Sequence, residues 1–327
     1  MIGSCVHWLE MTVSEGFLDR FLDRTIAPGF SRVGWELRKR AFEPLPDASG
    51  REVVITGAST GLGRSAARML AEAGASVTMV SRDRKRAEEA IIEVEAVSTS
   101  GGVHFEEADM SDLASVRSLA ASLSARLKKL DALILNAGVL LHERAITSDG
   151  IELAWATNVV GQYLLEHLLL DQLAAASGRV VMVTSGGAYS EGLSLPDSDL
   201  EGDEYDGPAV YARTKRAQIA LAELQSEQFA GKGISVHAVH PGWADTPGVQ
   251  TSLPTFRKVT RPFLRSADEG ADSIAWLAIA EEPVAQPGLL WHDRAPRPRN
   301  RIPGQRESAQ ERQKLDTELR RLSGLTN

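Results

Sequence analysis

Short apolar runs rich in β-branched residues alternate with longer helical patterns from residue 51 onward, and this alternation constrains the fold more than any other feature. Seven runs have the length and continuous apolarity of strands buried on both faces: Glu52–Thr56, Ser76–Val80, Val103–Glu107, Ala132–Leu135, Arg179–Thr184, Ile234–Val239 and Gly288–Trp291. Helical patterns separate them: Leu62–Ala73, Asp83–Val97, Asp112–Leu127, Gly150–Ala176, Tyr211–Gln228 and Ser266–Ala280. This alternation predicts an α/β protein with a Rossmann-type, doubly wound, parallel seven-stranded sheet and helices on both faces.

The composition is that of an ordinary globular protein and argues against several function classes. The 327 residues carry a net charge of −8, whereas nucleic-acid binders normally present a basic face. The single cysteine, Cys5, excludes a disulfide framework and a cysteine-based zinc site, and it favours a reducing, cytoplasmic compartment. No apolar run approaches the roughly 20 residues of a membrane span, and no His, Asp and Glu cluster has metal-ligand spacing. We therefore expect neither a transmembrane segment nor a metal.

Two segments lie outside the alternating core, so we expect three parts in the chain. They are an N-terminal helical extension over residues 1–50, a dinucleotide-binding catalytic domain over 51–292, and a Pro/Arg-rich segment with a helix over 293–327. In the extension, the apolar pattern from Phe17 to Ile26 predicts a helix that breaks at Pro28-Gly29. The extension is an extra helix packed on the domain, a contact in a homo-oligomer, or a peripheral membrane anchor.

The C-terminal part divides into an extended stretch and a helix. Residues 296–303 are rich in Pro and Arg, and we expect them to be extended. Residues 306–322 place Leu315, Leu319 and Leu322 on one stripe among charged side chains, which predicts a solvated helix.

A glycine-rich turn joins the first predicted strand to the first predicted helix, which is where a dinucleotide-binding loop belongs. Gly57 would allow the tight turn, Gly61 the approach of the backbone to a pyrophosphate, and Gly63 the packing of the helix on the sheet. The helix N-terminus would add free N–H groups and a partial positive charge. The residues expected at the cofactor are Thr56, Gly57, Ser59, Thr60, Gly61, Leu62 and Gly63. The alternative is a turn with a purely structural role.

The end of the second strand selects between the two nicotinamide cofactors. An acidic residue there would bind the ribose 2′-hydroxyl of NAD and repel the 2′-phosphate of NADP. This chain has Ser81 and Arg82 instead. The serine removes the repulsion and the arginine can pair with a phosphate, so we expect NADP(H) to be preferred over NAD(H). The alternative is that Arg82 points into water while Asp83 caps the next helix.

A tyrosine and a lysine four residues apart begin the helical pattern at 211. Tyr211 and Lys215 then lie on one helix face, one turn apart, where they could pass a proton in a carbonyl–alcohol interconversion. A phenol with a pKa near 10 is too weak a base at neutral pH. One cation about 4 Å away, at an effective dielectric constant near 20, can lower that pKa by about two or three units. The alternative is a surface pair without function, although no other tyrosine of this chain has a lysine four positions on.

In combination these motifs resemble the short-chain dehydrogenase/reductase family over about residues 50–292. The matching positions are the Thr56–Gly63 loop, Asn136-Ala137-Gly138, Asn158, Ser185, Tyr211, Lys215 and Pro241-Gly242. The loop has the TGxxxGxG pattern of the compact branch. The segments 240–248 and 291–294 are similar to the retinol-dehydrogenase-like group, whose members also carry an N-terminal extension.

The resemblance implies a role for four side chains. Ser185 would polarise the substrate oxygen and Tyr211 would transfer the proton. Lys215 would hold the nicotinamide ribose and tune the tyrosine, and Asn158 would support a proton-relay water.

Further cofactor contacts are expected along the same edge of the sheet. They are Asp109, Met110, Asn136, Ala137, Gly138, Pro241, Gly242 and Thr246. Asp109 is expected near adenine, with a helix N-cap role for Asp109 or Ser111 as the alternative. Thr246 is expected at the nicotinamide carboxamide, with a turn role as the alternative. Asn136 is equally suited to holding strand backbone groups, because a buried amide must be satisfied.

Ser185 and Tyr211 are 26 positions apart, which leaves a long insert at 186–210. We expect this insert and residues 247–262 to fold over a small-molecule substrate, and their apolar content favours a lipophilic ketone, aldehyde or alcohol. The sequence thus predicts an NADP-dependent oxidoreductase that interconverts a carbonyl and an alcohol by hydride transfer. The alternative is a non-catalytic NADP(H)-binding scaffold or redox sensor.

Overall fold

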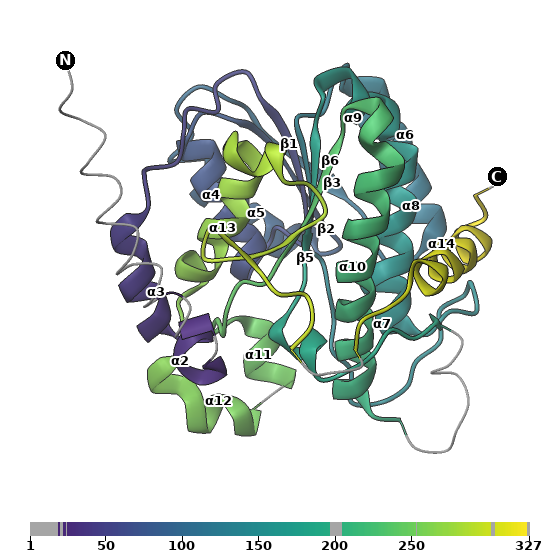
Figure 1. Cartoon of the computed structure of the whole chain (residues 1–327). Coiled ribbons are helices and arrows are strands. Elements are labelled where there is room, and N and C mark those ends of the chain that lie inside the picture. The colour runs from purple at the N-terminus through teal and green to yellow at the C-terminus, as the bar shows by residue number, and fades with distance from the viewer. Residues whose placement is uncertain are drawn as a thin grey trace, which may run out of the picture.

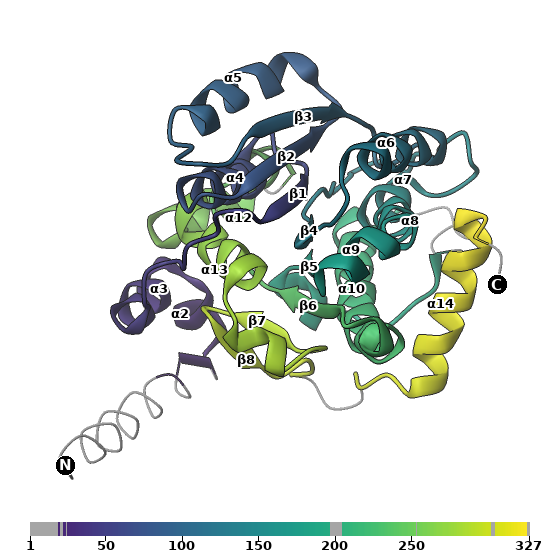
Figure 2. The same cartoon turned by 90° about the horizontal axis from the view of Figure 1, so that it is seen from above.

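A single twisted sheet forms the centre of the computed structural model, which describes residues 19, 22–23, 25–196, 205–252, 254–301 and 305–325. The strand order is β3-β2-β1-β4-β5-β6-β7-β8 (Figure 2), and Figure 1 shows the sheet between its helices. The strands are β1 Glu52–Thr56, β2 Ser76–Ser81, β3 Val103–Glu107, β4 Ala132–Leu135, β5 Arg179–Val183, β6 Ser235–Val239, β7 Leu290–His292 and β8 Ala295–Arg297. The order reverses between β1 and β4, which creates the crevice where ligands bind in open α/β sheets.

Seven of these strands are parallel and fall where the sequence predicts them, but the sheet has eight. The additional strand, β8, pairs antiparallel with β7. The turn between them has positive φ angles at Asp293 (52°) and Arg294 (54°), as the tightest hairpin turns require. A three-residue edge strand that contains Pro296 gives almost no periodicity, and the edge is where proline is tolerated. The predicted count of seven strands is therefore short by one.

Helices cover both faces of the sheet, as predicted (Figure 2). One face carries α4 Gly61–Glu72, α5 Arg84–Glu95 and α13 Ala267–Ile279; the other carries α6 Leu113–Arg126, α8 Gly161–Leu168 and α10 Gly207–Phe229. Each face has its own apolar core. No helix in the described parts of the chain combines the length and apolarity that a membrane span requires.

The helix predicted over 150–176 is interrupted. It consists of α7 Leu153–Trp155, a π-helical turn Ala156–Val160, α8, and α9 Leu170–Ala176. Gly161, which follows the π turn, packs so closely on Met110 that a Cβ atom would collide with the Met110 carbonyl oxygen. A π turn inside a helix frequently marks a functional site, and Asn158 lies within this one.

The described part of the N-terminal extension packs on the domain, with a different break from the one predicted. Helix α2 spans Ile26–Phe30 and α3 spans Arg32–Arg38, so the chain breaks at Ser31 and not at Pro28-Gly29. Pro28 stands in the first turn of α2, where a missing N–H is tolerated. Phe30 is buried at 2% exposure. Phe17, Leu18 and Phe21 of the predicted pattern lie outside the described residues.

The C-terminal helix α14, Ala309–Ser323, is docked, not solvated as predicted. Leu315 and Leu319 are fully buried, and α14 contacts α8 and α10 (Figure 2). The Tyr163 hydroxyl on α8 donates to Asp316 Oδ1 at 2.7 Å. The sequence prediction failed because a narrow leucine stripe does not reveal what it packs against.

Candidate active site

A cleft of about 1050 Å³ opens at the carboxyl ends of the strands and brings together most of the predicted site residues. Those that line it are Gly57, Ser59, Thr60, Gly61, Leu62, Ser81, Arg82, Asp109, Met110, Asn136, Ala137, Gly138, Ser185, Tyr211, Lys215, Pro241, Gly242 and Thr246. Thr56, Gly63 and Asn158 lie behind its wall. The part of the chain that the structure describes contains no group of three metal-ligating side chains.

The glycine loop has backbone geometry that other residues would resist. Gly57 and Gly61 have φ angles of +67° and +55°, in the left-handed region that glycine adopts without strain. A Cβ at Gly57 would lie 2.9 Å from the Cα of Ala137, and one at Gly63 would collide with the Gly57 carbonyl oxygen. Thr60, the N-cap of α4, makes no side-chain capping bond. The first N–H groups of α4 thus remain available to an anion at this end of the cleft.

Thr56 and Asn136 form a brace behind this loop. The Thr56 hydroxyl oxygen accepts from the main-chain N–H groups of Asn136 at 2.9 Å and Ala137 at 3.0 Å. Asn136 Nδ2 in turn donates to the carbonyl oxygens of Thr56 at 2.9 Å and Gly57 at 3.2 Å. Thr56 is completely buried and does not line the cleft, so its observed role is to shape the loop. Gly63 likewise packs behind the loop. The expected cofactor contacts of both residues stay predictions.

The end of β2, where the sequence predicts cofactor selection, presents both signs of charge. Ser81 Oγ donates to Ser59 Oγ at 3.0 Å. Arg82 is exposed at the rim, with Nη1 4.0 Å from Asp109 Oδ2, and Arg86 lines the same cleft. Asp83 caps α5 by accepting from the Arg86 N–H at 3.1 Å, as the alternative interpretation held. Sequence reasoning missed Arg86, although its position one turn after Arg82 could have indicated it.

Two other expected residues have clear local roles. Asp109 Oδ1 accepts from the N–H and hydroxyl of Ser111. The N-cap of α6 is Asp112, so the alternative N-cap role for Asp109 or Ser111 is wrong. Thr246 Oγ1 accepts from the Val249 N–H at 3.3 Å, which places Thr246 at the start of α11, Pro247–Ser252.

The predicted catalytic side chains meet between β5 and α10. Ser185 follows β5, and its hydrogen bond with Tyr211 opposes the effect of burial, which raises the pKa of the phenol. Lys215 Nζ lies 5.5 Å from the centre of the Tyr211 ring. Gly138 faces the group, because a Cβ there would lie 3.3 Å from Lys215 Nζ.

Lys215 is held from two sides. Its Nζ donates to the Val183 carbonyl oxygen at 2.9 Å and to Gln218 Oε1 at 3.1 Å. Burial lowers its pKa to about 7. We expected the lysine to lower the pKa of Tyr211; instead, burial of the pair raises the pKa of the phenol and lowers that of the amine. Burial disfavours the charged form of each group.

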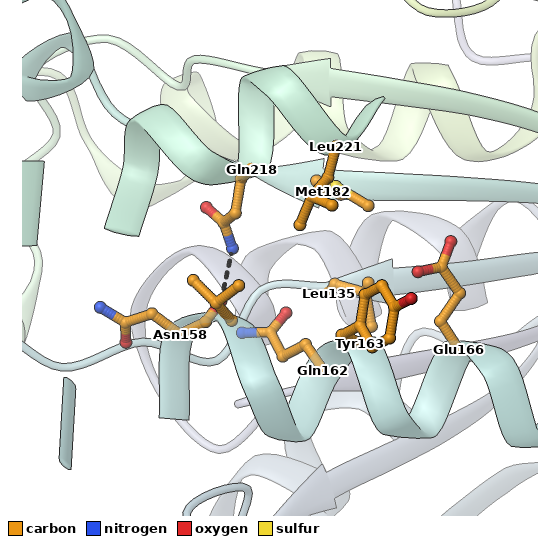
Figure 3. A pocket seen from close by; sticks show the side chains of 9 residues that line it. Leu135, Asn158, Gln162, Tyr163, Glu166, Met182, Gln218 and Leu221 are labelled. Carbon is orange, nitrogen blue, oxygen red and sulfur yellow. Dashed lines mark hydrogen bonds between the residues drawn. The ribbon is translucent and has the colours of Figure 1, made fainter. Parts of the chain in front are cut away.

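Asn158 fastens the loop after β4 to α10. Its Oδ1 accepts from the Val139 N–H at 2.8 Å, and its Nδ2 donates to the Val139 carbonyl oxygen at 3.0 Å and to Thr214 Oγ1 at 2.9 Å. Its main-chain carbonyl accepts from Gln218 Nε2 at 2.8 Å (Figure 3). Its side chain is thus engaged in structural bonds behind the cleft.

The substrate end of the cleft includes residues that sequence reasoning missed. Phe30 of α2 and Trp243 after β6 line it. The Phe30 ring packs edge-on against His240, with centroids 4.3 Å apart. The guanidinium of Arg301 lies over the rings of both Phe30 and Tyr189. No local sequence signal links positions this far apart.

The fold and the cleft together define a Rossmann-type, NAD(P)-dependent oxidoreductase. Residues 51–255 match the family described as short chain dehydrogenase. The chain therefore belongs to the short-chain dehydrogenase/reductase family, as the sequence resemblance implied.

Individual relatives confirm the predicted branch. The chain is 35% identical over 274 residues to dehydrogenase/reductase SDR family member 12 of Bos taurus, covering 82% of this chain and 86% of the relative. It is 36% identical over 241 residues to retinol dehydrogenase 12 of Bos taurus, covering 72% and 76%. A crystal structure of an uncharacterised protein from Mycobacterium paratuberculosis superposes with a TM-score of 0.69 at 28% identity, covering 86% of this chain and 96% of that one.

Proposed function

We propose that this chain is an NADP(H)-dependent oxidoreductase that interconverts a lipophilic ketone or aldehyde and its alcohol by hydride transfer. The observation that carries the proposal is the placement of Ser185, Tyr211 and Lys215 in the same cleft as the glycine loop. The cofactor, when bound, donates or accepts the hydride. The protein's own task is to hold the substrate oxygen and to move one proton.

Each polar side chain then has one task. The Ser185 hydroxyl hydrogen-bonds the substrate oxygen, and the Tyr211 phenol gives that oxygen a proton in reduction or takes one in oxidation. Lys215 holds the nicotinamide ribose. Asn158 acts behind the wall, since its side chain braces the Val139 loop and Thr214.

The cleft residues fit a phosphorylated dinucleotide. The open N-terminus of α4 and the glycine turn suit a pyrophosphate, and Arg82 and Arg86 lie at the rim where a 2′-phosphate would be recognised. The absence of an acid immediately after β2 supports NADP(H) over NAD(H). The carboxylate of Asp109, 4.0 Å from Arg82, reduces this preference for NADP(H) because it competes with the 2′-phosphate for the same guanidinium.

The substrate end of the cleft supports a lipophilic substrate. Its lining includes Phe30, Leu141, Ala212, Trp243 and Val249, which can bury an apolar body while Ser185 and Tyr211 hold one oxygen. The name of the 36% identical retinol dehydrogenase points to the same class of alcohol. We place the reaction in the cytoplasm because one cysteine in 327 residues fits a reducing compartment.

A carbonyl screen tests this function against that of a non-catalytic scaffold. The purified chain is mixed with NADPH and with retinal, aryl ketones or long-chain aldehydes, and the NADPH absorbance is followed. We expect oxidation of NADPH with at least one lipophilic carbonyl. Tight NADPH binding with no turnover across the whole set would instead support the scaffold or sensor.

A further inference from the structure

The buried Lys215 ammonium donates hydrogen bonds to one main-chain carbonyl and one side-chain amide. An ammonium has three N–H donors and needs acceptors when buried. One acceptor is the carbonyl of Val183 at the end of β5, and the other is a side chain, Gln218, one turn further along α10. Both acceptors are uncharged, so together they replace only part of the solvation that Lys215 loses by burial.

Gln218 is itself fixed at both ends of its amide. Its Oε1 accepts from Lys215 Nζ at 3.1 Å while its Nε2 donates to the main-chain carbonyl of Asn158 at 2.8 Å. The side chain is buried at 2% exposure. Figure 3 shows the amide reaching from α10 to the π turn that contains Asn158. An amide is suited to this place because it accepts from a cation and donates to a carbonyl at the same time.

A small cavity lies on the other side of Gln218. Its volume is about 10 Å³, close to the space that one water molecule needs. Gln162 and Glu166 of α8 line it together with Gln218. The side-chain oxygen Oε1 of Gln162 and that of Glu166 have no hydrogen-bond partner within the described residues. Gln218 thus separates the lysine from a second polar region.

We propose that Gln218 is a positioning residue of the active site, which holds the Lys215 ammonium at the cleft by tying it to the main chain at Asn158. This inference rests on the proposed function, because Lys215 matters only if the cleft holds a cofactor. Gln218 touches neither substrate nor cofactor and acts through the lysine. Without its amide, Lys215 keeps a single protein acceptor and becomes easier to deprotonate.

The neighbours of Lys215 allow a pH readout. Burial lowers its pKa to about 7. The titratable group beside it on α10 is Tyr211. Val183 lies at the end of β5, Ser185 follows that strand and Asn158 lies in the π turn, and all four residues are uncharged near pH 7. Loss of a hydrogen bond to a charged group is expected to lower the lysine pKa by about one further unit.

Gln218→Met removes the amide at nearly constant volume, and Gln225→Met is the matched control. Gln225 lies on the same helix, is fully buried, and donates to Glu166 Oε2 at 2.9 Å without touching Lys215. NADP⁺ affinity is measured by titration calorimetry between pH 6 and 9 for the wild type and both variants. This readout needs no turnover.

We expect NADP⁺ binding by the wild type to weaken as pH rises through the lysine pKa. In Gln218→Met the weakening should begin about one pH unit lower, whereas Gln225→Met should follow the wild type. Gln218→Glu keeps an acceptor and adds a negative charge, so it should raise the pH at which NADP⁺ binding begins to weaken. This variant is decisive if Gln218→Met does not fold.

Two results would overturn the proposal: an unchanged onset in the Gln218 variants, or an equal shift in Gln225→Met. Failure of the proposed function is a separate result. It would appear as normal turnover in a Tyr211 variant or as no turnover with any carbonyl, while the binding onset would still report on Lys215.

Discussion

At the scale of single residues, spacing along a helix predicted that Tyr211 and Lys215 lie together but not which residues support them. Tyr211 and Lys215 share a face because they are four residues apart, and they do meet in the cleft. Gln218, three residues after Lys215, lies on the same face, so its contact with the lysine was within reach of the sequence. Its other partner, Asn158, is 60 residues away, and only the fold brings them together.

Arg82 provides a test of cofactor selection. Arg82→Ala should weaken NADPH binding about tenfold or more, since a charge-assisted phosphate contact is lost, and should leave NADH binding almost unchanged. Fluorescence titration with both cofactors measures the ratio. Arg84→Ala is the control, because Arg84 is equally exposed but pairs with Glu107. Equal losses of NADPH and NADH affinity in Arg82→Ala would refute the proposal that Arg82 selects NADPH.

Glu166 should make the stability of the protein depend on pH. Burial raises its pKa to about 8, with a smaller contribution from Asp316 and an opposing one from Gln225. Between about pH 4.5 and 8 the folded state therefore holds a proton that the unfolded state has lost, and stability falls as pH rises. Glu166→Gln should match the wild type near pH 4.5 and exceed it at pH 8 by a few kcal/mol. Parallel denaturation curves for the two proteins across this range would contradict the prediction.

At the scale of elements, strands were more predictable than helix boundaries and docking. Six of the seven parallel strands are largely buried apolar runs, which the sequence shows clearly, whereas the edge strand β3 is only partly buried and contains His104, Glu106 and Glu107. Strand β8 is three residues long, and the π turn at Ala156–Val160 has no signature in composition. Helix α14 shows its leucine stripe but not its partners α8 and α10, which lie far earlier in the chain; the Tyr163–Asp316 bond alone spans 153 positions.

The docking of α14 predicts a clear stability difference along one helix. Leu315→Ala removes a fully buried side chain and should lower the free energy of unfolding by about 2–5 kcal/mol. Lys314→Ala, next to it but exposed, should change it by less than about 0.5 kcal/mol. Urea denaturation measures both. A solvated helix would give two equally small effects.

At the scale of the whole molecule, the two terminal segments meet behind the substrate end of the cleft. Arg265 donates to Asp293 of the β7–β8 turn and to the Gly29 carbonyl of the extension. Arg38 of α3 donates to the same aspartate at 2.8 Å. The sequence left open whether the extension packs on the domain, forms an oligomer contact or anchors to a membrane, and it could not show that these buried charges tie the extension to the domain.

This buried ionic cluster should be essential for stability. The pKa of Asp293 is far below its usual range because His292, Arg265 and Arg38 outweigh the effect of burial. Asp293→Ala takes from the buried Arg265 guanidinium its carboxylate partner among the described residues and leaves Arg38 with Asp19 alone, and it should cost about 3–5 kcal/mol. Asp245→Ala breaks the more exposed pair with Arg257 and should cost less than about 1 kcal/mol. Equal effects in thermal denaturation would mean that the cluster does not hold the termini.

The central claim is that the phenol of Tyr211 carries the proton of the reaction, and removal of that one oxygen tests it most directly. Tyr163→Phe is the control, because it deletes the hydroxyl of another buried tyrosine, which bonds Asp316 away from the cleft. With a carbonyl from the screen, Tyr211→Phe should bind NADPH normally and lose turnover by at least about a hundredfold, while Tyr163→Phe turns over as the wild type does. Turnover in Tyr211→Phe within a few-fold of the wild type would contradict the account.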